Sequence, residues 1–151
     1  MLDSYKKLLS SNTFKDWKNK NKDSYLCSCF NILENEDRNW QFDFYNKNNT
    51  ITSFIMNTTI EIDKDQEIFQ KEKTELKELN LEEVKLKLSE ALKLIKTKYK
   101  DNFFKTIAIL QPYVWNITLI SSEFKILNVK IDAITKKIIS EKYESVLKFK
   151  Q

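Results

Sequence analysis

Two cysteines are the first candidates for chemistry in this sequence, and the partners that such chemistry requires are missing. The chain contains Cys27 and Cys29 and no histidine. A thiol nucleophile needs a neighbouring base, usually His, and a structural zinc site needs four Cys or His ligands. Two positions apart on a strand, these cysteines should point to one face with roughly 6.5 Å between them, where a disulfide would be strained. We therefore expect two free thiols packed as small apolar groups, in a reducing compartment.

Acidic residues gather in two segments, and neither fits a known type of site. Residues 63–67 (DKDQE) begin like a calcium-binding loop, but Ile68 stands where that loop needs glycine and Thr74 where it needs Glu. Residues 34–37 (ENED) form an acidic turn, in which the carboxylates should be solvated. A carboxylate pair that does acid–base work needs a cleft that separates the two pKa values, and the sequence shows no sign of one.

Lysine alternates with aromatic residues in residues 14–22 and 96–105. Such segments can bind single-stranded nucleic acid by stacking and charge. Trp17 and Tyr99, however, fall at helical spacing with apolar residues, so we expect both in the core. Of the 26 basic residues, only Arg38 is the type whose planar fork suits phosphate and guanine. A lysine-rich binder of polyanions such as RNA or DNA is therefore the second hypothesis.

The residues that are absent exclude most familiar active sites. Without glycine there is no phosphate-binding P-loop, no dinucleotide-binding turn and no nucleophile elbow of the usual kind. Without histidine there is no Ser–His or Cys–His pair and no His-ligated metal. We expect no catalytic, cofactor-binding or metal-ligating residues, no cofactor and no enzymatic activity. Turns that need positive φ must use Asn or Asp, as in residues 46–49 (NKNN).

Length and composition indicate a folded domain of ordinary size. The chain has 151 residues, of which 41% are apolar, and its formal charge is +4. That length fits one domain or two very small halves that share a core. The first residues are charged and lack the apolar region of a signal peptide, and no apolar stretch approaches the roughly 20 residues of a membrane span. The sequence thus predicts a cytoplasmic protein without a membrane span.

Two similar series of elements follow from the hydrophobic periodicity. One or two helices are expected within residues 2–20, the second capped by Asn12 or Thr13. Residues 143–149 could form a short helix or an edge segment. Strands are expected at residues 25–33, 40–45 and 50–62, and again at residues 103–110, 113–121, 124–132 and 137–141.

The clearest helical pattern covers residues 81–99. Its apolar residues form one stripe: Leu81, Val84, Leu88, Ala91, Leu92, Ile95 and Tyr99. Asn80 can cap this helix with Glu83 as the third residue of a capping box, and Leu79 and Val84 stand where a hydrophobic staple belongs. We therefore predict one continuous helix here.

The two halves also match in sequence. A shift of 75 residues places residues 40–44 (WQFDF) on residues 115–119 (WNITL), so that Trp40 coincides with Trp115. We interpret this as a duplication of an α-β-β-β unit: residues 1–66 form the first repeat, residues 67–79 a charged connector, and residues 80–151 the second repeat. Each unit is too small to bury much surface alone, so the two should join edge to edge or face to face into one compact, pseudo-symmetric α+β fold.

Residues 124–138 (FKILNVKIDAITKKI) resemble the PepSY domain, in which a strand ends in an Asp-Ala pair, turns at glycine and returns as a strand with an aliphatic residue. The Asp-Ala pair corresponds to Asp132 and Ala133, whereas Lys136 stands where that family has glycine. The resemblance implies a PepSY/cystatin-like fold that binds and restrains partners and has no catalytic residues. Such domains are typical of exported proteins, although no signal sequence is visible here.

These patterns favour a non-catalytic protein that binds a protein or peptide partner through its sheet. An exposed edge strand offers main-chain donors and acceptors to an incoming segment. The same edge could pair with a second copy of the chain to form a homodimer.

Overall fold

The computed structural model describes residues 1–34, 37–68 and 75–145. The helices are α1 (Leu2–Ser10), α2 (Asn12–Lys20), the short 3-10 helix η1 (Leu81–Glu83) and α3 (Leu88–Lys98). The strands are β1 (Tyr25–Glu34), β2 (Asp37–Tyr45), β3 (Thr50–Met56), β4 (Ile60–Glu67), β5 (Phe103–Gln111), β6 (Val114–Ser121), β7 (Lys125–Asp132) and β8 (Ile138–Ser145).

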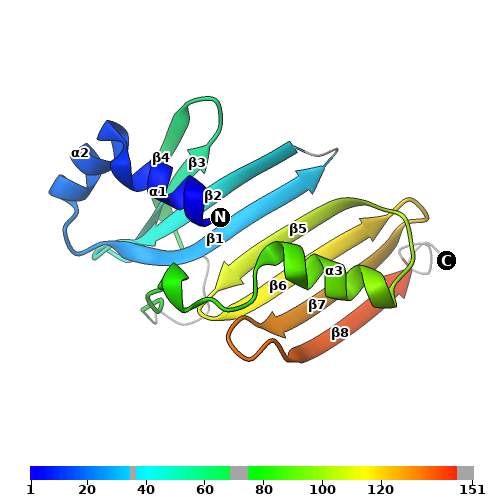
Figure 1. Ribbon diagram of the computed structural model, residues 1–151. Coiled ribbons are helices and arrows are strands. Elements are labelled where there is room, and N and C mark those ends of the chain that lie inside the picture. Colours follow the sequence, from blue (N-terminus) through cyan, green and yellow to red (C-terminus); the bar gives the residue numbers. More distant parts are fainter. Residues whose placement is uncertain (35–36, 69–74, 146–151) are drawn as a thin grey trace.

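All eight strands form one antiparallel sheet in the order β4-β3-β2-β1-β5-β6-β7-β8. The first four strands and the last four therefore run outward from a central pair, β1 and β5, which join from Cys29↔Leu110 to Glu34↔Lys105. The predicted α+β class is confirmed, and the two series of strands meet edge to edge (Figure 1).

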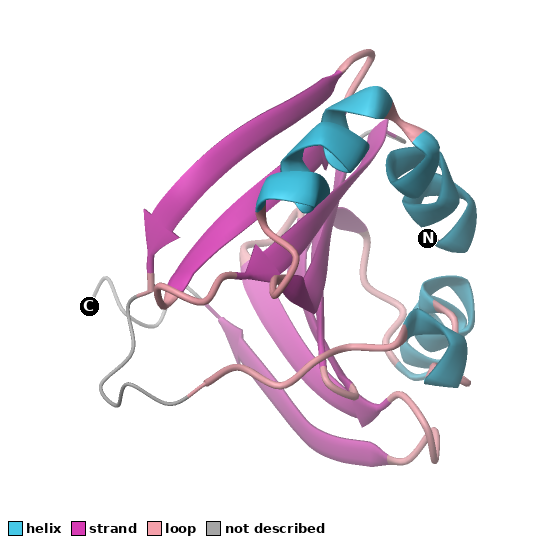
Figure 2. Ribbon diagram, turned by 90° about the vertical axis from the view of Figure 1, so that its left-hand side faces the viewer, coloured by secondary structure: helices cyan, strands magenta, loops and turns pink. Residues whose placement is uncertain are grey.

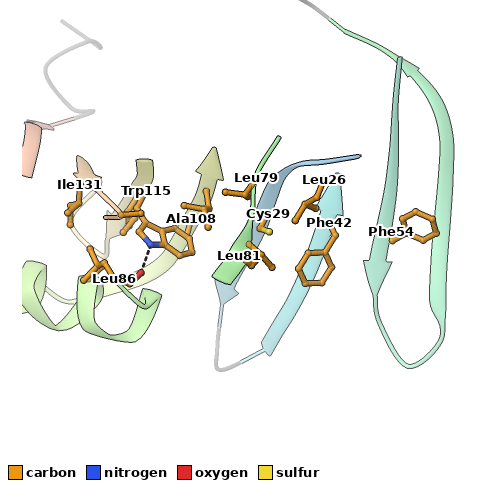
Figure 3. Close-up of a cluster of buried hydrophobic side chains, with 14 of the residues drawn as sticks. Leu26, Cys29, Phe42, Phe54, Leu79, Leu81, Leu86, Ala108, Trp115 and Ile131 are labelled. Atoms are coloured by element: carbon orange, nitrogen blue, oxygen red, sulfur yellow. Dashed lines mark hydrogen bonds between the residues drawn. The ribbon is translucent and has the colours of Figure 1, made fainter. Parts of the chain in front are cut away.

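The α-helices cover one face of this sheet (Figure 2). Inward-facing side chains of both halves belong to one continuous apolar core, part of which is drawn in Figure 3. The tryptophans that the repeat aligns, Trp40 of β2 and Trp115 of β6, both contribute to this core, and their rings lie 6.5 Å apart. A single core thus joins the halves, as expected for units too small to fold alone.

Each half contains four strands, so the predicted α-β-β-β unit is wrong. The four strands predicted in the second half correspond to β5 to β8, whereas only three were predicted in the first half. The expected strand 50–62 is two strands, β3 and β4, separated by a turn in which the Asn57 N–H donates to the Thr59 carbonyl. Polar Asn and Thr residues are turn formers, and alternation resumes in phase after the turn because Ile60 and Ile62 also pack against the core. The apolar pattern therefore did not reveal the reversal.

The continuous helix predicted for residues 81–99 is also wrong, because the chain is extended between η1 and α3. The backbone N–H groups of Lys85 and Leu86 both donate to the Ala133 carbonyl at 2.9 Å. The Leu86 carbonyl in turn accepts the indole N–H of Trp115 at 2.8 Å (Figure 3). These tertiary bonds replace the helical ones, and the Leu86 side chain becomes fully buried. Asn80 does cap the short helix η1, accepting from the Glu82 N–H.

Two further boundaries differ from the predictions. The cap of α2 is Ser11, whose hydroxyl accepts from the Phe14 N–H at 3.2 Å, and not Asn12 or Thr13. Strand β8 continues to Ser145, past the predicted end at residue 141. For residues 143–145, the edge-segment alternative is therefore right and the helix alternative is wrong. Residues 146–149 of that segment lie outside the described residues, as do residues 69–74 of the connector.

Turns without glycine use more than Asn and Asp. Asn49 takes positive φ, at 60°, in the turn before β3, and Asp65 does so, at 53°, at the bulge of β4, as predicted for residue types that tolerate this region. Phe124 and Lys136 do so too, at 60° and 66°. Lys136 therefore adopts the backbone conformation that favours glycine, at the position where the PepSY pattern has glycine.

Candidate functional site

The two cysteines are buried and unreactive. Cys29 lies in the apolar core, whereas Cys27 lies at a β-bulge opposite β2 and donates to the Asp43 carbonyl at 3.3 Å. The bulge interrupts the alternation on which the expectation of a shared face rested. Burial raises the pKa of Cys27 to about 12 and that of Cys29 further still. Both thiols are therefore protonated at neutral pH, which suits packing and not nucleophilic attack.

The described residues of the two acidic segments do not form sites either. Residues 63–67 lie within β4, paired with β3, and so have the backbone of a strand and not of a calcium-binding loop. Glu34 ends β1 and Asp37 begins β2, but residues 35–36 between them lie outside the described part of the chain. Within residues 1–34, 37–68 and 75–145, no group of three or more Cys, Asp or Glu side chains is placed to hold a metal ion.

Two aromatic residues of the lysine-rich segments, Trp17 and Tyr99, pack against the protein as predicted, whereas Phe104 is 45% exposed. Trp17 is buried against Phe44 and Phe54, with ring centroids 5.4 and 5.1 Å away. Tyr99 is half-buried and stacks on Tyr143 of β8 at 5.4 Å. Neither ring is free to stack on a nucleotide base in this arrangement.

The two edges of the sheet differ in how well they are shielded from another strand. In β4, Glu61, Asp63 and Lys64 are exposed, and the register shifts next to Asp65, whose φ is positive. Charge and a bulge on an edge strand both prevent pairing with a further strand. The large apolar residues of β4, Ile60 and Ile62, face the core. The β4 edge is therefore blocked.

Strand β8 offers a more open edge, with two exposed charged residues, Lys142 and Glu144. Ile138 and Ile139 are 49% and 55% exposed, and Tyr143 is 38% exposed. A register shift places Ile139 as the extra residue at the start of the strand, after which pairing with β7 is regular from Ser140 to Ser145. Among the described strands, β8 has β7 as its sole neighbour. Its backbone can therefore accept one more strand.

Contacts from α3 hold β8 in place. Lys98 pairs with Glu141 at 2.8 Å, Tyr99 stacks on Tyr143, and the Tyr143 hydroxyl donates to Asp101. These contacts lie at the end of α3, on the helix-covered side of the sheet (Figure 1). They orient β8 without occupying the hydrogen-bonding groups on its outer side. The sequence predicted binding at an exposed edge strand but did not identify which one. It ended this strand at residue 141 and left residues 143–149 as a short helix or an edge segment. The alternation of Glu141 and Tyr143 was the signal that could have extended the strand.

The turn between β7 and β8 is tightly bonded. The Asp132 carboxylate accepts the backbone N–H groups of Ile134 and Thr135, both at 2.8 Å. These two bonds, from Thr135 first, lower the pKa of the exposed Asp132 side chain below its usual value. Ala133 is fully buried, and its carbonyl receives the bonds from Lys85 and Leu86. The Asp-Ala pair therefore positions both the hairpin and the segment before α3.

None of the helices in the described residues combines the length and the apolar character needed to cross a membrane.

Comparison with known proteins gives a fold and no family. No protein-family model matches the chain, and no curated protein matches its sequence. The fold is similar to a crystal structure described as that of a "putative lipoprotein" from Clostridium difficile 630, with a TM-score of 0.58 and 11% sequence identity. The similarity covers 88% of this chain and 91% of that one. At this identity the likeness shows a shared fold alone.

Proposed function

We propose that this protein is a non-catalytic binding protein that pairs strand β8 with an extended segment of a partner protein or peptide. The observation that carries the proposal is the contrast between the edges of the sheet. In β4 the bulge lies within the strand and most outward side chains are charged. In β8 the bulge lies at Ile139, near the start, and a regular run from Ser140 to Ser145 follows; Ile138 and Ile139 are exposed, as are the charged Lys142 and Glu144. Main-chain hydrogen bonds along such an edge supply affinity, and the side chains that flank it supply specificity.

The absence of a catalytic role belongs to the same proposal. Burial raises the pKa of Tyr5 and of Cys27 to about 12, and that of Cys29 further still. A general base or activated nucleophile needs a pKa near the operating pH. These groups therefore serve packing and not turnover.

The edge is tested by selecting peptides from a random library and measuring hydrogen exchange of the protein with and without them. Bound peptides should slow exchange of backbone amides within β8. Ile139→Lys adds a charge to the edge and should weaken binding about tenfold or more, because edge charges oppose strand addition. The matched control is Leu94→Lys, which adds the same charge at a 50% exposed position of α3 and should bind as the parent does.

Light scattering on the same samples shows whether a foreign partner or a second copy of the chain occupies the β8 edge. A monomer that binds selected peptides at β8 supports a foreign partner, whereas a concentration-dependent dimer with protected β8 amides identifies a second copy of the chain. Peptides that leave β8 exchange unchanged, or equal binding by Ile139→Lys and Leu94→Lys, contradict the proposal.

A second candidate function is polyanion binding by α3. Lys93, Lys96 and Lys100 line one shallow, exposed depression together with Thr97. Titration with single-stranded RNA at two salt concentrations tests it, since counterion release makes affinity fall steeply with salt. Affinity that is weaker than micromolar, or that is insensitive to salt, rejects this candidate.

The relation to PepSY domains and the duplication are part of the proposal as well. The Asp132–Ala133 turn, the positive φ of Lys136 and the mirrored strand order support both. Relatives with glycine at position 136 would strengthen the family relation, and relatives that keep a tryptophan at both Trp40 and Trp115 would strengthen the duplication.

The location of the protein in the cell is also part of the proposal. The sequence favours the cytoplasm, whereas the structural neighbour is described as a lipoprotein, which is the competing context. Fractionation of source cells with an antibody against the chain distinguishes the two.

A further inference from the structure

A cavity lies between the helices and the sheet, and no residue of the edge strand β8 lines it. Its volume is about 430 Å³, within the roughly 300–1,000 Å³ of small-molecule pockets. Its floor is formed by Asn31 and Leu33 of β1 and Trp40 of β2. The remaining lining residues come from the start of α1 and from the η1–α3 segment: Met1, Leu2, Asp3, Leu81, Val84, Lys87, Leu88, Ser89 and Leu92.

Asn31, at the floor of this cavity, is a buried polar residue whose side chain forms no hydrogen bond with the rest of the described protein. The side chain is 1% exposed, and neither its Nδ2 nor its Oδ1 has a hydrogen-bond partner among the described residues. It sits opposite Ala108 in the central strand pair, which offers no polar side chain. A buried amide without partners is costly, so most buried polar groups in proteins are hydrogen-bonded.

Asn46 provides a comparison, because it is a buried asparagine whose side chain is fully hydrogen-bonded within the protein. Asn46 is 4% exposed; its Oδ1 accepts from the Ser24 hydroxyl, and its Nδ2 donates to Thr50 and Thr52. Its side-chain oxygen and nitrogen are thus both bonded. The unbonded amide of Asn31 lies at the base of a cavity instead. Less than 1 Å² of either polar atom is exposed, so a ligand that bonds to this amide must displace the side chains that cover it.

We propose that this cavity binds a small aliphatic molecule whose carboxamide pairs with Asn31. A carboxamide offers one donor and one acceptor side by side, which complement Oδ1 and Nδ2 together. A carboxylate would leave Oδ1 unpaired and would lose its hydration in an apolar pocket. The aliphatic part of the ligand then lies along Leu88, Leu92 and Leu2, toward the polar rim formed by Lys87, Ser89 and Asp3.

Octanamide is the test ligand, and octanoate and octanol are the comparisons. Nuclear magnetic resonance on the full chain should show saturable shifts of the Asn31 side-chain NH2 and the Trp40 indole with octanamide. One extra satisfied hydrogen bond corresponds to about fivefold tighter binding, so octanamide should exceed octanoate by at least that factor. Ser89→Trp fills the exposed rim and should abolish the shifts, whereas Thr97→Trp, two turns along α3, should not.

Asn31→Leu provides the second arm. It removes the unpaired amide, so it should raise Tm by roughly 3 °C or more and reduce the preference for octanamide over octanoate to about one. The proposal is overturned if octanamide gives no saturable shift at Asn31, if Ser89→Trp and Thr97→Trp bind equally, or if the Asn31→Leu variant keeps the amide preference. Should Asn31→Leu fail to fold, the pair of tryptophan variants decides.

Discussion

The two halves of the sheet have mirrored strand order but pack their helices with different side chains. In the first half, four aromatic residues of α2, β2 and β3 contact one another in every combination, with ring centroids 5.1 to 5.9 Å apart: Phe14, Trp17, Phe44 and Phe54. In the second half, α3 contributes Ala91 and Ile95, and the strands contribute buried aliphatic residues: Ile117, Leu119, Leu127, Val129 and Ile131. The strand order therefore depends on the alternation of apolar residues and not on their identity.

The halves also differ in what fixes the segment before the strands. In the first half, helix α1 leads to α2 through a single residue, Ser11, whose hydroxyl caps α2. In the second half, the extended segment before α3 is held by backbone bonds to Ala133 and by the Trp115 indole. Side-chain geometry thus organises one half, and long-range hydrogen bonds organise the other.

Replacing Trp115 should produce the largest effect and the sharpest contrast with its counterpart. Trp115→Ala removes a fully buried ring and leaves the Leu86 carbonyl without its donor, so we expect a loss of about 5 kcal/mol in unfolding free energy. Trp40→Ala removes a half-buried ring and should cost about 2 kcal/mol. Urea denaturation measures both. Equal losses would mean that the two tryptophans are equivalent in packing as well as in sequence.

The aromatic half should tolerate a change of side-chain shape less well than the aliphatic half. Phe54→Leu keeps an apolar residue but removes three edge or tilted ring contacts, with Phe14, Trp17 and Phe44, and should cost about 2 kcal/mol. Ile117→Leu conserves volume in the second half and should cost less than about 1.5 kcal/mol. Both are measured by thermal and urea unfolding. A larger loss for Ile117→Leu would reverse the comparison.

Replacing turn residues by glycine should change the free energy of unfolding less than the core substitutions do, and Lys136→Gly should increase it. Lys136 and Asn49 both hold positive φ, in the last hairpin of the second half and the β2–β3 turn of the first. A lysine is more strained there than an asparagine, so Lys136→Gly should stabilise the fold by up to about 1 kcal/mol. Asn49→Gly should instead cost up to about 1 kcal/mol, because it removes the hydrogen bond that the Tyr45 hydroxyl donates to the Asn49 Oδ1. Matched Tm measurements compare them. A destabilised Lys136→Gly would show that the lysine side chain contributes more than its backbone costs.

Sequence patterns revealed the elements of this fold well and their tertiary interruptions poorly. Period-two alternation located most of the strands, because burial on one face imposes it directly. The reversal at Asn57 was hidden because Ile60 continues the same alternation, and the break in the predicted helix was hidden because Leu86 bonds to Trp115, 29 residues away. No local pattern can encode a hydrogen bond to so distant a strand.

The candidate sites were less predictable than the fold. That β8 is an open edge depends on strand order, which the sequence does not state. Asn31 looks like any strand residue in sequence, because its lack of partners depends on Ala108 and Trp40, which face it from the neighbouring strands. The composition did exclude the chemistries that need His or Gly, because these residue types are absent from the whole chain.

The smallest predicted effect is a difference between the last hairpins of the two halves in how their stability depends on pH. Asp132 stands 75 residues after Asn57, so the β7–β8 turn has a titratable carboxylate where the β3–β4 turn has an amide. The N–H groups of Thr135 and Ile134 hold the pKa of folded Asp132 below its usual 3.8, so the folded state binds this proton less readily than the unfolded state. The resulting stabilisation is complete above the unfolded pKa and disappears as pH falls through the folded one.

Carbon-detected titration of the Asp132 carboxyl should therefore give a midpoint below 3.8. Asp132→Asn makes the second hairpin resemble the first in charge, because an amide oxygen can still accept both N–H bonds. The variant should lose the part of the acid sensitivity that Asp132 contributes while keeping its fold at neutral pH. A midpoint at or above 3.8, or unchanged acid unfolding in the variant, would show that the two backbone bonds do not distinguish the charged carboxylate from the neutral group.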